Sequence, residues 1–215
     1  MSVIPDKSQK LQQQIEKAAQ LLQNGGVVAF PTDTVYGLGA SPYCSEAVAR
    51  IYSIKQRLRH LPFPILLADQ EQLSEVVESV PEIARILIDQ FWPGGLTLVL
   101  PRKPSFPGSG TRDEKSIAVR IPAHDVTLAI IRIACTPIIG TSANISKLPN
   151  ALTAREVNAQ LGSVVDLIVD GGECPGGIES TVVDVTRDVP LILRKGVIPE
   201  SEIMKVCREY MKGGT

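Results

Sequence analysis

The chain has 215 residues, of which 44% are hydrophobic and 21% charged, values typical of a folded domain with a sizeable core that exclude a largely disordered chain. It carries 22 Lys+Arg against 23 Asp+Glu, and the net charge of -1 excludes a uniformly basic coat for nucleic acid but not a local basic cleft. Aromatic residues make up only 4%, which argues against a stacking platform for single-stranded bases.

The sequence favours a cytoplasmic protein without a membrane segment. No apolar run approaches the ~18 residues that a membrane helix needs, and residues 1–24 mix charged residues with glutamines instead of forming a secretory hydrophobic stretch. Four cysteines are widely scattered, with no Cys-x-x-Cys pair. Free thiols are therefore favoured over a zinc site or a disulfide framework.

Hydrophobic periodicity and turn residues predict about seven helices and about eight short strands. The expected helices cover residues 8–23, 45–55, 70–77, 81–91, 125–134, 153–161 and 199–211. The expected strands cover residues 27–30, 65–68, 96–100, 116–121, 137–140, 167–169, 181–185 and 191–194. Because some strands follow helices and others follow strands, we expect an α/β fold with a mixed parallel and antiparallel sheet flanked by helices.

No internal repeat and no break in composition marks a domain boundary. We therefore expect a single domain over residues 1–215, with a motif-bearing core at about residues 10–198. The long loop at residues 101–115 is rich in Pro, Gly, Ser and charged residues. A loop of this length inside a compact domain is either a mobile lid or a surface excursion, and the sequence leaves both readings open.

Polar residues follow apolar strands in several places, where open sheets bind ligands. Residues 31–39 place two threonines and Asp33 before two glycines, which let the backbone approach a ligand; a simple turn is the alternative. Lys55 and Arg57 would diverge on a continuous helix. They can converge on one anion only if the helix ends near Lys55, as the prolines at 62 and 64 favour. Otherwise they belong to a solvated helix end.

Two further segments combine glycines with hydroxyl groups. In residues 138–146, a strand runs into Gly140 and then a dense set of hydroxyls and an amide. If a helical turn begins there, its N–H groups form an anion cradle; an ordinary Ser/Thr turn is the alternative. Residues 170–181 contain four glycines followed by a carboxylate and two hydroxyls, which a hairpin turn also explains. Arg120 and Arg194, at strand ends, can add positive charge to the same rim.

Together these segments describe a hydroxyl-lined, positively charged cleft. The sequence contains neither a metal-ligand cluster nor a Gly-x-Ser-x-Gly motif, and no Cys/His pair argues for covalent catalysis. Such a cleft suits a phosphate-bearing ligand and chemistry that depends on positioning and electrostatics. No general base is evident.

The ordered motifs of the chain resemble those of the YrdC-like family, and within it the threonylcarbamoyl-AMP synthases. In chain order they are GGVVAFPTDTVYGLGA, IKQR, PGGLTLVL, IAVRIPAH, GTSANIS, DGG, GIESTVVDVT and ILRKG. The resemblance covers about residues 25–197 and implies a twisted mixed sheet around a deep, positively charged cavity. It also implies that L-threonine, bicarbonate and ATP are joined into L-threonylcarbamoyl-AMP and pyrophosphate, a step towards N6-threonylcarbamoyladenosine in tRNA.

The same resemblance implies roles for particular residues. The catalytic set maps to Lys55, Arg57, Ser142 and Asn144. Threonine contacts map to Thr34, Arg120 and the backbone at Gly140 and Thr141. Nucleotide contacts map to Arg57, Ser116, Ser142, Asn144, Asn150, Ser180 and Arg194. Mg²⁺ is expected to arrive on the ATP phosphates and not in a dedicated protein site. Expected partners are tRNA and the proteins that transfer the threonylcarbamoyl group to it.

Three positions depart from the family pattern: Leu58 replaces a common proline, Lys147 replaces a glycine, and Leu66 stands where longer members carry a histidine. Two other functions stay open. The positively charged cleft also suits a non-catalytic module that binds structured RNA in the same cavity. The three departures suggest a divergent paralogue that acts on another carbamoyl-type substrate.

Overall fold

The computed structural model describes residues 7–58, 61–107 and 115–213. Its strands are β1 (Val28–Phe30), β2 (Gly37–Ala40), β3 (Ile65–Leu66), β4 (Leu96–Pro101), β5 (Ser116–Arg120), β6 (Ile138–Ser142), β7 (Leu167–Ile168), β8 (Thr181–Asp184) and β9 (Leu191–Arg194). They form one sheet of order β7-β1-β2-β6-β3-β5-β4-β8-β9. The pairs β7–β1, β3–β5 and β4–β8 are parallel and the other neighbours are antiparallel, which confirms the predicted mixed sheet.

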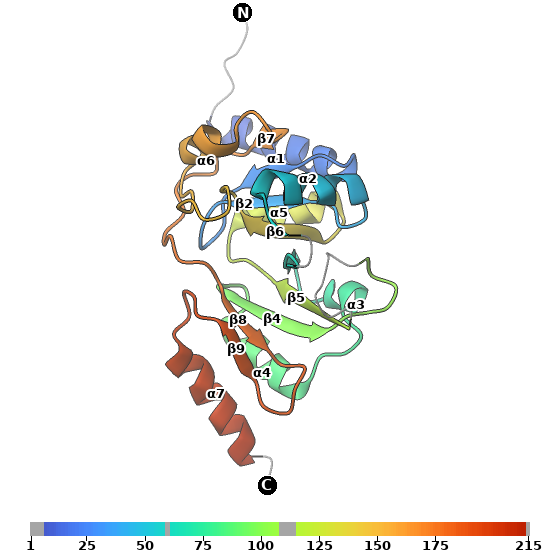
Figure 1. Ribbon diagram of the computed structural model, residues 1–215, viewed down its shortest axis with the longest axis vertical. Coiled ribbons are helices and arrows are strands. Elements are labelled where there is room, and N and C mark those ends of the chain that lie inside the picture. The colour runs from blue at the N-terminus through green and yellow to red at the C-terminus, as the bar shows by residue number, and fades with distance from the viewer. Residues whose placement is uncertain (1–6, 59–60, 108–114, 214–215) are drawn as a thin grey trace, which may run out of the picture.

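Helices gather at both ends of the sheet. They are α1 (Lys7–Gln23), α2 (Ser45–Lys55), α3 (Leu73–Val76), α4 (Glu82–Phe91), α5 (Asp125–Ala134), α6 (Ala154–Leu161) and α7 (Glu200–Gly213). Figure 1 shows α1, α2 and α5 around β2 and β6, and α4 and α7 beside β4, β8 and β9 at the other end. No helix in the described ranges is long and apolar enough to cross a membrane.

Strand β1 is buried on both faces. Val28 and Phe30 pack in a cluster with α1 and α5, whereas Val27 and Ala29 belong to the larger core on the opposite face. Successive side chains of a strand point to opposite faces, so helices on both sides require an unbroken apolar run such as this one. The prediction of a short, fully apolar strand here is confirmed.

Strand β2 was not among the predicted strands, because residues 31–39 were expected only to follow a strand. It lies between β1 and β6 and pairs antiparallel with both. A Cβ atom at Gly37 or at Gly39 would lie 2.7 Å from ring atoms of Phe30. The glycines therefore leave room for that ring, and the described residues contain nine strands where eight were expected.

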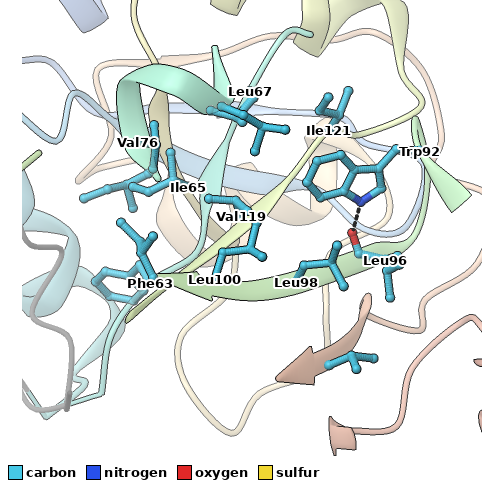
Figure 2. Packing of buried hydrophobic residues seen from close by; sticks show 14 of the residues in the cluster. Phe63, Ile65, Leu67, Val76, Trp92, Leu96, Leu98, Leu100, Val119 and Ile121 are labelled. Carbon is cyan, nitrogen blue, oxygen red and sulfur yellow. Dashed lines mark hydrogen bonds between the residues drawn. The ribbon is translucent and has the colours of Figure 1, made fainter. Parts of the chain in front are cut away.

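Alternation along β4 and β5 separates the core from the opposite face of the sheet. Trp92 lies among the buried side chains of Figure 2 and donates a hydrogen bond from Nε1 to the Leu96 carbonyl at 2.7 Å. The core side chains labelled there include Phe63, Ile65, Leu67, Val76, Leu98, Leu100, Val119 and Ile121. Residues at the alternate positions, such as Thr97, Val99, Ala118 and Arg120, line a cavity.

The loop after β4 is anchored where it begins. The Lys103 N–H donates to the Val76 carbonyl at 2.9 Å, and Phe106 packs edge-on against Tyr43 with ring centroids 5.7 Å apart. Residues 108–114 lie outside the described residues, so the choice between a lid and a surface excursion for residues 101–115 stays open. The described start of the loop packs against α3 and the segment before α2.

Candidate active site

The candidate site is a cavity of about 570 Å³, to which β2, β3, β4, β5, β6, β8 and β9 all contribute residues. Its polar lining consists of Thr32, Thr34, Arg57, Thr97, Arg120, Thr141, Ser142, Glu179, Ser180 and Arg194. Three arginines therefore face one carboxylate among the described lining residues. This composition suits an anionic ligand.

Helix α2 ends at Lys55, which is the condition under which Lys55 and Arg57 were expected to converge on one anion. Gln56 adopts a left-handed conformation (φ 49, ψ 39). The Arg57 N–H then donates to the Tyr52 carbonyl at 3.0 Å. Lys55 consequently reaches the end of β6, while Arg57 lines the cavity. The alternative of a solvated helix end is wrong for Lys55, which is only 3% exposed.

Lys55 ties together the turn that follows β6. Its Nζ donates to the Ser142 carbonyl at 2.5 Å and to Ser142 Oγ at 3.1 Å. It also donates to the carbonyl and to Oδ1 of Asn144, both at 2.9 Å. Burial lowers the pKa of Lys55 to about 8, because the charged amine has lost most of its water. Three members of the predicted catalytic set thus meet around one amine.

Arg57 lines the cavity and keeps one donor without a partner among the described residues. Its guanidinium stacks over the Phe63 ring at 4.9 Å, and one Nη donates to the Pro62 carbonyl at 3.2 Å. Burial lowers the pKa of Arg57. Within the described residues, its buried Nε has no hydrogen-bond partner. A buried, unsatisfied N–H group costs free energy, which the fold bears while it holds this cation at the cavity.

Arg120 is held by a network that the sequence did not reveal. It is 6% exposed and donates to Asp33 Oδ1 at 2.6 Å, to Thr34 Oγ1 at 3.1 Å and to the Gly94 carbonyl at 2.8 Å. Asp33 also accepts from the Ala123 N–H at 3.1 Å. Burial lowers the pKa of Arg120, and the charge of Asp33 opposes that effect. Asp33 is therefore a partner of Arg120 across the sheet and more than a local turn residue.

Arg194 and Ser180 form the opposite rim. Arg194 donates from Nε to the Ser180 carbonyl at 3.0 Å and from Nη2 to Ser180 Oγ at 2.9 Å. Its Nη1 pairs with Glu179 at 2.6 Å. The Ser180 hydroxyl lies 2.7 Å from that of Thr97. Arg120 and Arg194, which the sequence predicted to add charge to one site, line the same cavity.

The backbone at Gly140 and Thr141 belongs to a strand and not to a helix start. Strand β6 continues through Ser142 and pairs with β2, and the next helix, α6, begins at Ala154. The conditional expectation of an anion cradle at a helix N-terminus is therefore wrong. Gly140, Thr141 and Ser142 line the cavity from the sheet instead.

Four residues implied by the resemblance are not part of this lining. Lys55 and Asn144 bond to each other beside Ser142, whereas Ser116 and Asn150 lie elsewhere. Ser116 pairs with Pro101 at the end of β5 opposite Arg120. Asn150 donates to the Gly177 carbonyl at 3.3 Å in a loop. Neither belongs to the described cavity lining, so their nucleotide contacts stay predictions.

The three departures from the family pattern lie in different surroundings. Leu66 lines the cavity and lies over Gly140, where an added Cβ would be 2.4 Å from its Cγ. Leu58 is 63% exposed. Lys147 adopts φ 75, a left-handed conformation that favours glycine. Only Leu66 among them bears directly on the cavity. Arg59 and His60, which belong to the basic cluster after Lys55, lie outside the described residues.

The fold and the cavity define an α/β protein with an arginine-rich, hydroxyl-lined site for an anionic ligand. A family model named for Sua5, YciO and YrdC, and described as "Telomere recombination", matches residues 20–196. The chain belongs to this family, and the resemblance drawn from its motifs is confirmed.

Two curated relatives of the chain are named threonylcarbamoyl-AMP synthase. The chain is 41% identical over 210 residues to the threonylcarbamoyl-AMP synthase of Pyrococcus abyssi, covering 97% of this chain and 62% of the relative. It is 42% identical over 194 residues to that of Bacillus subtilis, covering 90% and 56%. The solved structure of P. abyssi Sua5 complexed with L-threonine matches with a TM-score of 0.86 and 43% identity, covering 89% of this chain and 56% of that one. The chain thus spans less than two thirds of the length of these relatives.

Proposed function

We propose that the chain catalyses the formation of L-threonylcarbamoyl-AMP and pyrophosphate from L-threonine, bicarbonate and ATP, for N6-threonylcarbamoyladenosine in tRNA. One observation carries the proposal: Arg57, Arg120 and Arg194 line one cavity together with several hydroxyl groups. The names of the relatives support the same reaction.

The threonine would lie on the Arg120 side. Arg120 and the Thr34 hydroxyl are 3.1 Å apart and both line the cavity, so together they offer a cation and a hydroxyl to a carboxylate. Gly140 and Thr141 border the same space. The threonine complex of the P. abyssi relative supports an amino-acid site in this fold.

The proposed reaction requires the protein to neutralise phosphate charge and to align the reacting groups. Bicarbonate loses hydroxide to give carbon dioxide, and the neutral amine of threonine attacks its carbon. The proton that the amine loses combines with the hydroxide as water, which leaves a carbamate. A carbamate oxygen then bonds to the α-phosphorus of ATP, the bond from that phosphorus to the bridging oxygen breaks, and pyrophosphate leaves. Arg57 and Arg194 would neutralise the phosphates, and Ser142 and Asn144 would orient oxygens. An enclosed site protects the carbamate from water.

Lys55 would act through its neighbours. Its amine is bonded to four oxygens of Ser142 and Asn144, and Lys55 itself is not part of the described cavity lining. It therefore holds both residues in place and contributes its charge from behind them. At pH 7, below its pKa of about 8, it is mainly protonated, as these hydrogen bonds require.

The donor set of the cavity fits a Mg²⁺ ion that arrives with the nucleotide. Mg²⁺ prefers oxygen ligands and often combines one or two carboxylates with substrate phosphates. Glu179 is the carboxylate in the described lining, beside several hydroxyls. In the described ranges, no group of three or more His, Cys, Asp and Glu residues is placed to hold a metal alone. The ion would neutralise phosphate charge and ease the departure of pyrophosphate.

The test is a pyrophosphate-release assay with the pure protein, L-threonine, bicarbonate, ATP and Mg²⁺. We expect release that depends on threonine and bicarbonate, and a threonylcarbamoyl-AMP product detectable by mass spectrometry. Release without threonine, or none, would contradict the proposal. Because Leu66 lines the cavity, serine and valine should be tested in place of threonine; a clear preference for either would support the divergent-paralogue alternative.

Arg57→Ala provides the matched test of the site. We expect it to lower threonine-dependent turnover at least tenfold, which corresponds to about 1.4 kcal/mol of barrier. Arg155→Ala is the control, because Arg155 is an exposed arginine on α6 outside the described lining. Equal turnover of Arg57→Ala and Arg155→Ala would show that Arg57 does not contribute to the reaction.

A further inference from the structure

Glu179 is a carboxylate in a cavity that otherwise favours anions. It is the carboxylate among the described lining residues, together with Arg57, Arg120 and Arg194. Its side chain is 33% exposed, and its Oε2 pairs with Arg194 Nη1 at 2.6 Å. Its charge is also felt by Lys55, Arg57 and Arg120, where it opposes the lowering of each pKa by burial. The carboxylate thus lies within electrostatic reach of every cation of the site.

Arg194 does not depend on Glu179 for its position. Two of its nitrogens donate to the carbonyl and hydroxyl of Ser180, and these contacts stay in place if the carboxylate moves away. The backbone of Glu179 is itself held, because its carbonyl accepts from the Val197 N–H at 2.9 Å. Within the described residues, the second carboxylate oxygen has no hydrogen-bond donor. One oxygen of a firmly placed carboxylate is therefore available to a ligand.

A negative charge beside a triphosphate weakens nucleotide binding unless a cation lies between them. The rim that carries Glu179 also carries Ser180 and Arg194, which are the residues proposed for the nucleotide. We propose that Glu179 binds the Mg²⁺ ion that the nucleotide brings into the cavity. The inference rests on the proposed function, because it requires a nucleotide at this rim. Metal binding would explain why a carboxylate lies at this rim, since Arg194 is already held by Ser180.

The experiment measures binding, without turnover. The probe is α,β-methylene-ATP, which cannot release pyrophosphate, titrated calorimetrically into the full chain with excess chelator or with Mg²⁺. We expect Glu179→Gln to tighten metal-free binding about tenfold, because a repelling charge is removed. We expect the tightening caused by Mg²⁺ to shrink about tenfold relative to that in the unaltered chain. Mn²⁺ in place of Mg²⁺ should give an electron paramagnetic resonance spectrum that changes in this variant.

Two further variants separate a metal ligand from a structural ion pair. Glu200→Gln removes an exposed carboxylate that pairs with Lys195 at 2.6 Å outside the cavity, and it should leave both binding constants unchanged. Glu179→Asp keeps the charge but shortens the side chain. Binding of the nucleotide analogue without metal should therefore stay weak, and Mg²⁺ should tighten that binding less than in the unaltered chain.

The outcomes distinguish this inference from the proposed function. An unchanged Mg²⁺ effect in Glu179→Gln would overturn the inference and leave nucleotide binding intact. If Glu179→Gln weakened the binding of threonine and left nucleotide binding unaltered, the inference would also be overturned, because the carboxylate would then face the substrate amine. Failure of the unaltered chain to bind the nucleotide with or without Mg²⁺ would overturn both the inference and the proposed function.

Discussion

Replacing Lys55 with methionine tests whether one buried amine holds the site together. The substitution keeps an unbranched apolar stem and removes the ammonium group that bonds to Ser142 and Asn144. Four oxygens lose their donor, and two of them are backbone carbonyls. These oxygens would then need hydrogen bonds from water, or the turn after β6 would have to change conformation.

The expected cost follows from the acceptors that lose their donor. A buried acceptor left unsatisfied costs about 1–3 kcal/mol, and the two backbone carbonyls of Ser142 and Asn144 are fixed by the chain. We therefore expect Lys55→Met to lower the free energy of unfolding by about 3 kcal/mol, a large part of a typical domain's stability.

Urea unfolding followed by fluorescence provides the measurement. Trp92 is the single tryptophan of the chain and lies in the core, so its emission reports global unfolding. Lys195→Met is the control, because it removes an exposed amine that pairs with Glu200, and an exposed pair contributes little to stability. If the two variants lose similar stability, the amine does not tie the turn to α2.

Three further predictions use the same unfolding assay. Because the Lys55 pKa is about 8 when folded and 10.5 when unfolded, only the unfolded state holds this proton between those values. Stability relative to Lys55→Met should therefore rise by about 2 kcal/mol from pH 7 to 9.5, and a constant difference would contradict the lowered pKa. Gly196→Ala should cost about 2 kcal/mol or more, because its Cβ would lie 2.3 Å from the Ser180 carbonyl carbon; Gly176→Ala, with open space around it, should be tolerated. Lys147→Gly should stabilise by about 0.5–1 kcal/mol, since φ is 75 there; a loss of stability would refute that reasoning.

Local pattern was sufficient for most elements of the fold, because their apolar periodicity matches the burial that the sheet imposes. The helix 125–134 and the strand 191–194 were predicted with the bounds the structure gives them. Strand β2 was missed because glycine is uncommon in strands. Its two glycines are explained by the Phe30 ring, which packs over Gly37 and Gly39. No window around residue 37 reveals such a contact between strands.

The site was predicted unevenly for a similar physical reason. Residues whose types suggest anion binding, such as Lys55 and Arg57, were found from their own sequence. Their convergence depended on the left-handed Gln56 that ends α2, which the nearby prolines indicated only as a condition. Asp33 was read as a turn residue because its partner, Arg120, is 87 positions away. Glu179 was recorded only as part of a glycine-rich turn, and its place between several cations follows from the sheet.

The four cations of the site share a mode of attachment that bears on how it works. Lys55, Arg57, Arg120 and Arg194 each donate to at least one backbone carbonyl, those of Ser142, Pro62, Gly94 and Ser180 among them. A carbonyl orients a cation without cancelling its charge, and within the described part of the chain only Arg120 and Arg194 among these four also pair with carboxylates, those of Asp33 and Glu179. Burial lowers the pKa values of Arg57 and Arg120, and repulsion from Arg194 adds to that effect. The fold therefore holds four cations close together with two carboxylates to offset them. A polyanionic ligand relieves that repulsion without moving the groups, as electrostatic preorganisation requires.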